Sequence, residues 1–176
     1  YPPRLSRGSL CELGAQIGAD VPFCLLGGTA RATGLGEILR PLPALTGCFF
    51  VVCMPDYGIS TPEAFARYDR VGAEHRPNTD LAVRAVEEGQ LQQLCAAMGN
   101  ALQKAAGGPG TERLCGRLRA LGASAAQLTG SGAAVFGVFE TAEGAQAALD
   151  SIAPEVRRAF LCTPFAQGAK IFSEEE

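Results

Sequence analysis

One short segment places a carboxylate where it could act as a base. Asp20 lies in the sequence Gly18-Ala19-Asp20-Val21-Pro22-Phe23. A helical pattern ends at Gly18, and Pro22 fixes the backbone just beyond the acid, so we expect the carboxylate to be held at a helix boundary. A carboxylate in such a place can accept a proton from a bound hydroxyl. The alternative is a helix cap, in which the Asp20 side chain accepts hydrogen bonds from backbone amides.

A second segment has the composition of a phosphate-side loop. The residues Thr129-Gly130-Ser131-Gly132 carry no bulky side chain and lie between two predicted strands. Their backbone amides could therefore approach a phosphate or support a neighbouring loop that does so. The same residues also suit an ordinary hairpin turn that binds nothing, because glycine accepts positive backbone angles.

A third candidate is the start of a helix. Thr61-Pro62-Glu63 combines a cap, a first-turn proline and an early acid, which is typical of a helix N-terminus. Phe65 follows four positions after Thr61. The helical pattern alone favours a core position for Phe65 and a capping role for Thr61, and contact of either side chain with a ligand is the alternative.

The predicted elements that must position these residues have an α+β order. From Cys48 onward, the order is strand, helices, strand, strand, helix, strand, which predicts a ferredoxin-like split β-α-β domain with extra helices in its first crossover. Before it, a helix ending at Gly18 and a two-stranded hairpin within residues 27–42 are expected. The predicted helix caps are Ser9, Asn78 or Thr79, Thr111 and Thr141.

Composition narrows the class of protein. The chain has 176 residues, 47% of them hydrophobic, and a net charge of -3 without a basic cluster, so we expect a globular protein that does not bind nucleic acid. Seven cysteines without a Cys-x-x-Cys pair indicate a reduced, cytoplasmic protein. The longest apolar run, Cys48 to Met54, is far below the about 20 residues needed to cross a membrane. The single histidine, His75, has no metal-ligand spacing to other residues, so no metal site is expected.

Together these segments resemble the GHMP kinases. The likeness rests on the Asp20 segment with its following glycines, on residues 55–65, and on residues 128–136. Within the family they are most similar to the branch that phosphorylates a hydroxyl of a cytidine diphosphate derivative in the non-mevalonate route to isoprenoid precursors. The resemblance implies the remainder of an S5-like N-terminal domain in residues 1–45 and the ferredoxin-like C-terminal domain in residues 46–176.

The resemblance also implies roles for the candidate residues. Asp20 is expected to take the substrate hydroxyl proton while ATP, with Mg²⁺, donates a phosphoryl group. Phe65 is expected to stack on the cytosine ring with Thr61 close by, and the loop of Thr129, Gly130, Ser131 and Gly132 is expected on the nucleotide side. The expected partner is the small-molecule substrate, with a homodimer left open.

The sequence departs from the family in one respect. The family also relies on an N-terminal lysine and on a glycine- and serine-rich loop around the ATP phosphates, and neither occurs in these 176 residues. The cluster Gly107-Gly108-Pro109-Gly110 lacks the Lys-Ser or Lys-Thr of a Walker A motif. We therefore expect no useful kinase activity from this chain alone. The open alternatives are another GHMP kinase, of the homoserine or mevalonate kinase type, and a non-catalytic binding or assembly fragment.

Overall fold

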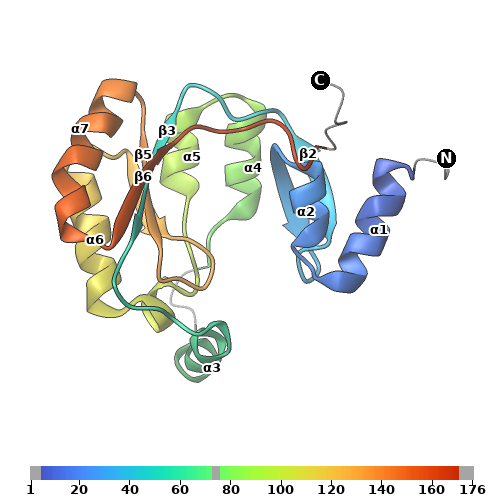
Figure 1. Cartoon of the computed structure of the whole chain (residues 1–176), viewed down its shortest axis with the longest axis horizontal. Helices are drawn as coiled ribbons and strands as arrows, with labels where there is room; N and C mark the ends of the chain where they lie inside the picture. The colour runs from blue at the N-terminus through green and yellow to red at the C-terminus, as the bar shows by residue number, and fades with distance from the viewer. Residues whose placement is uncertain (1–4, 73–75, 171–176) are drawn as a thin grey trace. The chain divides into compact units, whose positions relative to one another are not determined.

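The computed structural model describes residues 5–72 and 76–170 (Figure 1). His75 lies outside the described residues. The chain divides into two compact units, one formed by Tyr1–Thr46 with Pro164–Glu176 and the other by Gly47–Thr163. The predicted domains, 1–45 and 46–176, stay a prediction.

The first unit contains two helices and a hairpin. Its elements in chain order are α1 (Arg7–Ile17), α2 (Val21–Leu26), β1 (Thr29–Thr33) and β2 (Ile38–Leu42). The antiparallel pairing of β1 with β2, from Thr29 opposite Leu42 to Thr33 opposite Ile38, agrees with the predicted hairpin. The prediction that Ser9 caps α1 is wrong. The helix begins earlier, and Ser9 N–H donates at 3.1 Å to the side-chain oxygen of Ser6, which is the actual cap.

The segment after Pro164 returns to α2. Ala169 N–H donates to the Cys24 carbonyl at 2.9 Å. Gly27, directly after α2, has φ +69, and a Cβ atom placed there would lie 2.0 Å from the backbone nitrogen of Gly168. Only glycine fits such a close backbone approach, so this position joins two segments that are far apart in the sequence.

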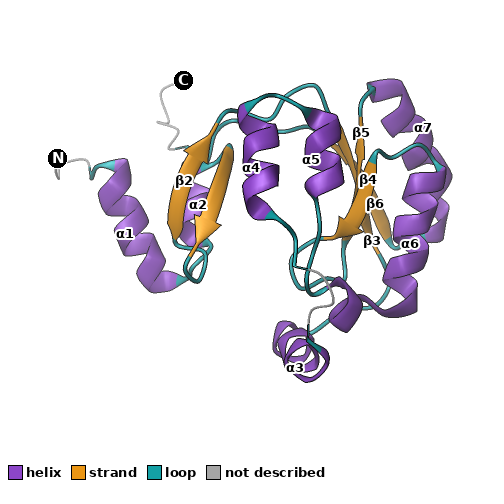
Figure 2. Cartoon of the chain, turned by 180° about the vertical axis from the view of Figure 1, so that it is seen from behind, coloured by secondary structure: helices purple, strands orange, loops and turns teal. Residues whose placement is uncertain are grey.

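The second unit is built on one four-stranded antiparallel sheet. Its strands are β3 (Phe49–Met54), β4 (Ala125–Leu128), β5 (Val135–Phe139) and β6 (Arg158–Cys162). They lie in the order β4-β5-β3-β6, and Figure 2 shows them gathered beside α6 and α7. Val51 in the central strand β3 lies opposite Gly137 on one side and Leu161 on the other. The first and third strands of the unit are therefore neighbours, which confirms the predicted ferredoxin-like α+β architecture.

The helices of the second unit complete the split β-α-β pattern. They are α3 (Thr61–Val71), α4 (Thr79–Glu87), α5 (Leu91–Ala97), the π-helical turn η1 (Gln103–Gly107), α6 (Gly108–Ala120), α7 (Ala142–Ile152) and the 3₁₀ turn η2 (Ala153–Glu155). Helices α6 and α7 pack on the sheet, whereas α4 and α5 pack on each other (Figure 1).

The structure confirms two of the predicted caps of these helices and contradicts two others. Thr141 caps α7 by accepting from Gly144 N–H at 3.1 Å, as predicted, and Asn78 caps α4. Ser60, not Thr61, occupies the cap position of α3. Thr111 is not a cap, because α6 begins at Gly108 and places Thr111 inside the helix, fully buried.

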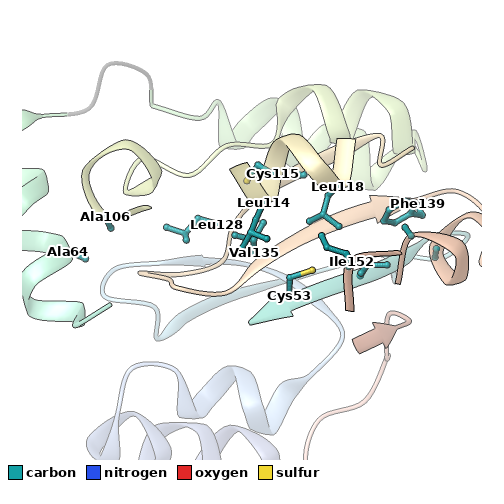
Figure 3. Close-up of a cluster of buried hydrophobic side chains, with 14 residues drawn as sticks. Cys53, Ala64, Ala106, Leu114, Cys115, Leu118, Leu128, Val135, Phe139 and Ile152 are labelled. Atoms are coloured by element: carbon teal, nitrogen blue, oxygen red, sulfur yellow. The ribbon is translucent and has the colours of Figure 1, made fainter. Parts of the chain in front are cut away.

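The hydrophobic core lies between the sheet and the two helices that cover it. Leu118 of α6 and Ile152 of α7 meet Val51, Val135 and Phe139 of the strands, and all five side chains are almost completely buried (Figure 3). The sheet is thereby fixed, and with it the loops at the strand ends. One of these loops is the glycine-rich segment between β4 and β5.

Candidate active site

In the first unit, the Asp20 carboxylate does not cap the helix that it precedes. Asp20 occupies the cap position of α2 with φ -85 and ψ -14, but its side chain makes no capping hydrogen bond and is exposed. Its backbone carbonyl accepts from Cys24 N–H at 3.2 Å. Pro22, one residue into the helix, is buried and fixes the turn. The acid is thus held by its backbone while its side chain is left to solvent.

The turn between β1 and β2 lies beside this acid. Gly36 has φ +127, and a Cβ atom placed there would lie 3.4 Å from Asp20 Oδ1 and 3.7 Å from Ala19 Cβ. Glu37, in the same turn, uses its own carboxylate to accept from Leu35 N–H at 2.7 Å. Of these two neighbouring acids, Glu37 therefore braces the turn and Asp20 does not.

In the second unit, two of the candidate residues meet directly. The hydroxyl oxygens of Thr61 and Ser131 lie 2.7 Å apart, although the residues are 70 positions apart in the sequence. Thr61 is the first residue of α3, and Ser131 belongs to the glycine-rich loop. This contact joins the start of α3 to the loop.

Phe65 extends from the same helix into solvent. Its side chain is 51% exposed, whereas the neighbouring Ala64 is completely buried. The core position that the helical pattern favours for Phe65 is therefore wrong, because Ala64 takes the inward face of α3. The exposed ring lies one helical turn after Thr61 and is available for stacking.

The glycine-rich loop closes as a tight hairpin. Gly132 N–H donates to the Thr129 carbonyl at 3.0 Å, and Thr129 N–H donates to the Ala134 carbonyl at 3.0 Å. Gly132 has φ +97, and a Cβ atom there would lie 2.8 Å from Ile59 Cδ1. This glycine is needed for close packing as well as for its backbone angle.

Two side chains that sequence reasoning missed hold this loop from the outer edge of β4. Asn100 Nδ2 donates to the carbonyls of Leu128 at 2.9 Å and Gly130 at 2.8 Å. Gln103 Oε1 accepts from Leu128 N–H at 2.9 Å. The available signal was Gly99-Asn100, which interrupts an otherwise helical stretch, but its partners lie more than 25 residues away in the sequence.

A cavity of about 670 Å³ lies along the same edge of β4. Asn100, Gln103 and Arg119 line it, and Arg119 also donates to the Ala126 carbonyl at 2.6 Å. None of the seven candidate residues lines this cavity. Asp20 belongs to the first unit and the other six candidates to the second.

The buried thiols are poor nucleophiles. Burial raises the pKa of Cys53 to about 11, with Cys115 and Glu155 adding to the shift, and burial also raises the pKa of Cys48, Cys95 and Cys115. Across the described residues, no group of three or more His, Cys, Asp or Glu side chains could hold a metal ion. No helix in that part of the chain is long and apolar enough to cross a bilayer.

Comparison with known proteins identifies the family. Residues 82–157 match the family described as GHMP kinases C terminal. Over 151 residues the chain is 36% identical to 4-diphosphocytidyl-2-C-methyl-D-erythritol kinase of Alkaliphilus metalliredigens, covering 85% of this chain and 52% of that protein. The chain belongs to the GHMP kinases. The kinase of the same name from Listeria monocytogenes is 32% identical over 166 residues, which cover 93% of this chain and 56% of that protein.

Solved structures of other GHMP kinases agree. A crystal structure of 4-(cytidine 5'-diphospho)-2C-methyl-D-erythritol kinase matches with a TM-score of 0.74 and 31% identity, covering 92% of this chain and 57% of the other. Homoserine kinase from Cytophaga hutchinsonii matches with a TM-score of 0.67 at 17% identity, over 84% and 52% of the two chains, which shows the fold alone. This chain spans about half the length of the curated relatives it matches.

Proposed function

We propose that the protein to which this chain contributes transfers the terminal phosphoryl group of ATP to the 2-hydroxyl of 4-diphosphocytidyl-2-C-methyl-D-erythritol. The observation that carries the proposal is the state of Asp20. Its carboxylate is exposed, makes no capping bond and lies two residues before the buried Pro22, whose ring fixes the backbone angle there. Two relatives that are more than 30% identical over most of this chain bear the name of that kinase.

The chemistry requires little covalent help from the protein. The substrate hydroxyl oxygen forms a bond to the terminal phosphorus, the bond to the ADP oxygen breaks, and the hydroxyl proton passes to Asp20. Positioning and charge neutralisation supply most of the catalysis in such transfers. A carboxylate held by its backbone beside the open turn at Gly36 suits the role of proton acceptor.

Substrate recognition is assigned to the second unit. Phe65, half exposed on α3, supplies a face on which a cytosine ring can stack. Thr61, which bonds to Ser131, holds the start of α3 against the loop of Thr129 to Gly132. The loop amides would then face phosphate groups, as the absence of bulky side chains allows.

ATP and Mg²⁺ are part of this proposal. Magnesium is usually bound by one or two carboxylates together with nucleotide phosphates. The described residues offer no group of three or more His, Cys, Asp or Glu side chains for the ion, so the nucleotide phosphates would supply most of its ligands, and Asp20 keeps the role of proton acceptor. When bound, the ion would neutralise charge on the phosphates.

The proposal includes the cellular location and the partners of the enzyme. We place it in the cytoplasm, supported by cysteines that remain free in the described residues. Its partner is the small cytidine diphosphate substrate, and its net charge of -3 argues against a nucleic-acid partner. Whether two copies associate is left to measurement by sedimentation.

The decisive experiment joins this chain to the N-terminal part of a relative, because the chain matches only about half of each relative's length. The N-terminal half of the Alkaliphilus protein, joined ahead of Leu5, should give ADP release with 4-diphosphocytidyl-2-C-methyl-D-erythritol. Homoserine and mevalonate should give none. Asp20→Asn in the same fusion should lower kcat by about 10²- to 10⁴-fold. Phosphorylation of homoserine or mevalonate instead, or full activity of Asp20→Asn, would contradict the proposal.

A further inference from the structure

The side-chain amide of Asn100 is hydrogen-bonded at both its nitrogen and its oxygen. Its Nδ2 donates to the carbonyls of Leu128 and Gly130 at 2.9 and 2.8 Å, and its Oδ1 accepts from Leu102 N–H at 2.9 Å. The two donations fix the orientation of the amide, because an oxygen placed there would face two other oxygens. Asn100 is part-buried and lies outside every segment that carried the family resemblance.

These bonds determine which way the loop amides point. In a trans peptide unit, the C=O and N–H groups point in opposite directions. At Leu128 the carbonyl points to Asn100, and the N–H of the same peptide unit, on Thr129, donates to Ala134 on the other side at 3.0 Å. The Gly130 carbonyl also points to Asn100, so the N–H of Ser131 points away from it.

A glycine loop needs such a restraint. Gly130 has φ +56, and glycine adopts backbone angles that other residues do not, so rotation about its ψ could turn over the peptide unit that follows it. The Asn100 donation opposes this rotation. The Ser131 hydroxyl is hydrogen-bonded to that of Thr61 at 2.7 Å, so the backbone N–H is the group of Ser131 that remains to donate to a ligand.

We infer that Asn100 is a positioning residue that turns the Ser131 N–H outward, where it donates to a phosphate oxygen of the bound ligand. This inference rests on the proposed function, because it takes the loop to face phosphate. Asn100 itself does not touch the ligand. It acts by holding two carbonyls on the opposite side of the loop.

The test uses the 176-residue chain labelled with ¹⁵N. Inorganic pyrophosphate serves as a probe of the loop, and cytidine, which has no phosphate, serves as a probe of Phe65. Pyrophosphate should shift the Ser131 amide resonance. Asn100→Ala, which adds no charge, should weaken pyrophosphate binding by about 10-fold or more and change cytidine binding by less than about 2-fold. A loss of folding would weaken both, so the split separates positioning from general structure.

Two further variants test whether the effect comes from the two lost donations. Asn100→Asp keeps the acceptor for Leu102 N–H but loses both donations, and should speed hydrogen exchange of the loop amides as Asn100→Ala does. Asn78→Ala, the matched control, removes the cap that accepts from Leu81 N–H and should speed exchange only in α4.

Three results would overturn the inference: no shift of the Ser131 amide with pyrophosphate, equal pyrophosphate binding by Asn100→Ala and the unaltered chain, or unchanged loop exchange in both Asn100 variants. The proposed function would fail differently. In that case cytidine would leave the resonances of Phe65 unmoved, whatever pyrophosphate does at Ser131.

Discussion

The hydroxyl groups of Thr61 and Ser131 lie 2.7 Å apart and join the start of α3 to the loop between β4 and β5. The contact spans two elements that share no backbone hydrogen bond. We expect Thr61→Val and Ser131→Ala each to lower the free energy of unfolding, and the double variant to lower it by about 0.5 to 1 kcal/mol less than the sum of the two. Urea unfolding of the three variants measures this. Strict additivity would show that the two hydroxyls do not interact.

Replacing Asp20 should leave stability unchanged. Because its side chain does not cap α2, Asp20→Asn is expected to change the free energy of unfolding by less than about 0.5 kcal/mol. Thr141→Ala is the matched control, since Thr141 does cap α7 and its loss should cost about 1 kcal/mol. Thermal unfolding measures both. A clear loss of stability in Asp20→Asn would mean that the carboxylate supports the fold.

Phe65 should matter for binding and not for folding. Its ring is 51% exposed, so Phe65→Ala should change stability little, while cytidine binding should weaken by about 10-fold with the loss of one stacking partner. Calorimetric titration with cytidine measures the second effect. Phe139→Ala provides the contrast, because Phe139 is 2% exposed and its truncation should cost about 3 to 5 kcal/mol. Unaltered cytidine binding by Phe65→Ala would remove the stacking role.

Thr111→Val should stabilise the second unit. The Thr111 hydroxyl oxygen is fully buried and has no hydrogen-bond partner among the described residues. A buried polar group without a partner costs about 1 to 3 kcal/mol, and valine has nearly the same shape. Chemical unfolding should show a gain of about 1 kcal/mol. A loss of stability would indicate that the hydroxyl has a partner in solution.

The protein should lose stability in alkali because of its buried thiols. Burial raises the pKa of Cys53 to about 11 from an ordinary value of 9.0, so the folded state keeps a proton that the unfolded state releases. This contribution is fully present below pH 9 and is lost as the pH rises through about 11, with a slope of up to about 1.4 kcal/mol per pH unit for one thiol.

Unfolding midpoints measured between pH 8 and 10.5 should therefore fall, and should fall less steeply in Cys53→Val, which cannot ionise. An equal pH slope in the two proteins would assign the alkaline loss to other groups.

The sheet and its order could be predicted because they follow from local patterns. The apolar runs around Val51 and Val135, with the glycine-rich turn between the later strands, determine a four-stranded unit, and topology rules leave few arrangements. Thr141 was predictable as a cap for the same reason, since a cap and its amide are three residues apart. Local chemistry is visible in a sequence.

The failures came from long-range geometry and from competing local signals. Asn100 could not be recognised, because its function depends on carbonyls about 30 residues away. Ser9 and Thr111 are residue types that often cap helices, but α1 and α6 begin earlier, so both residues lie inside the helices. Phe65 looked like a core residue because periodicity does not reveal which face of α3 the neighbouring Ala64 occupies.

The four-stranded unit begins and ends on adjacent strands, since Phe50 near its start lies opposite Cys162 near its end. A segment whose two ends are neighbours can be relinked by a short bridge and reopened elsewhere, as in a circular permutant. Residues 47–163 can thus be exchanged between members of the family as one cassette, with a single pair of adjacent junctions to engineer.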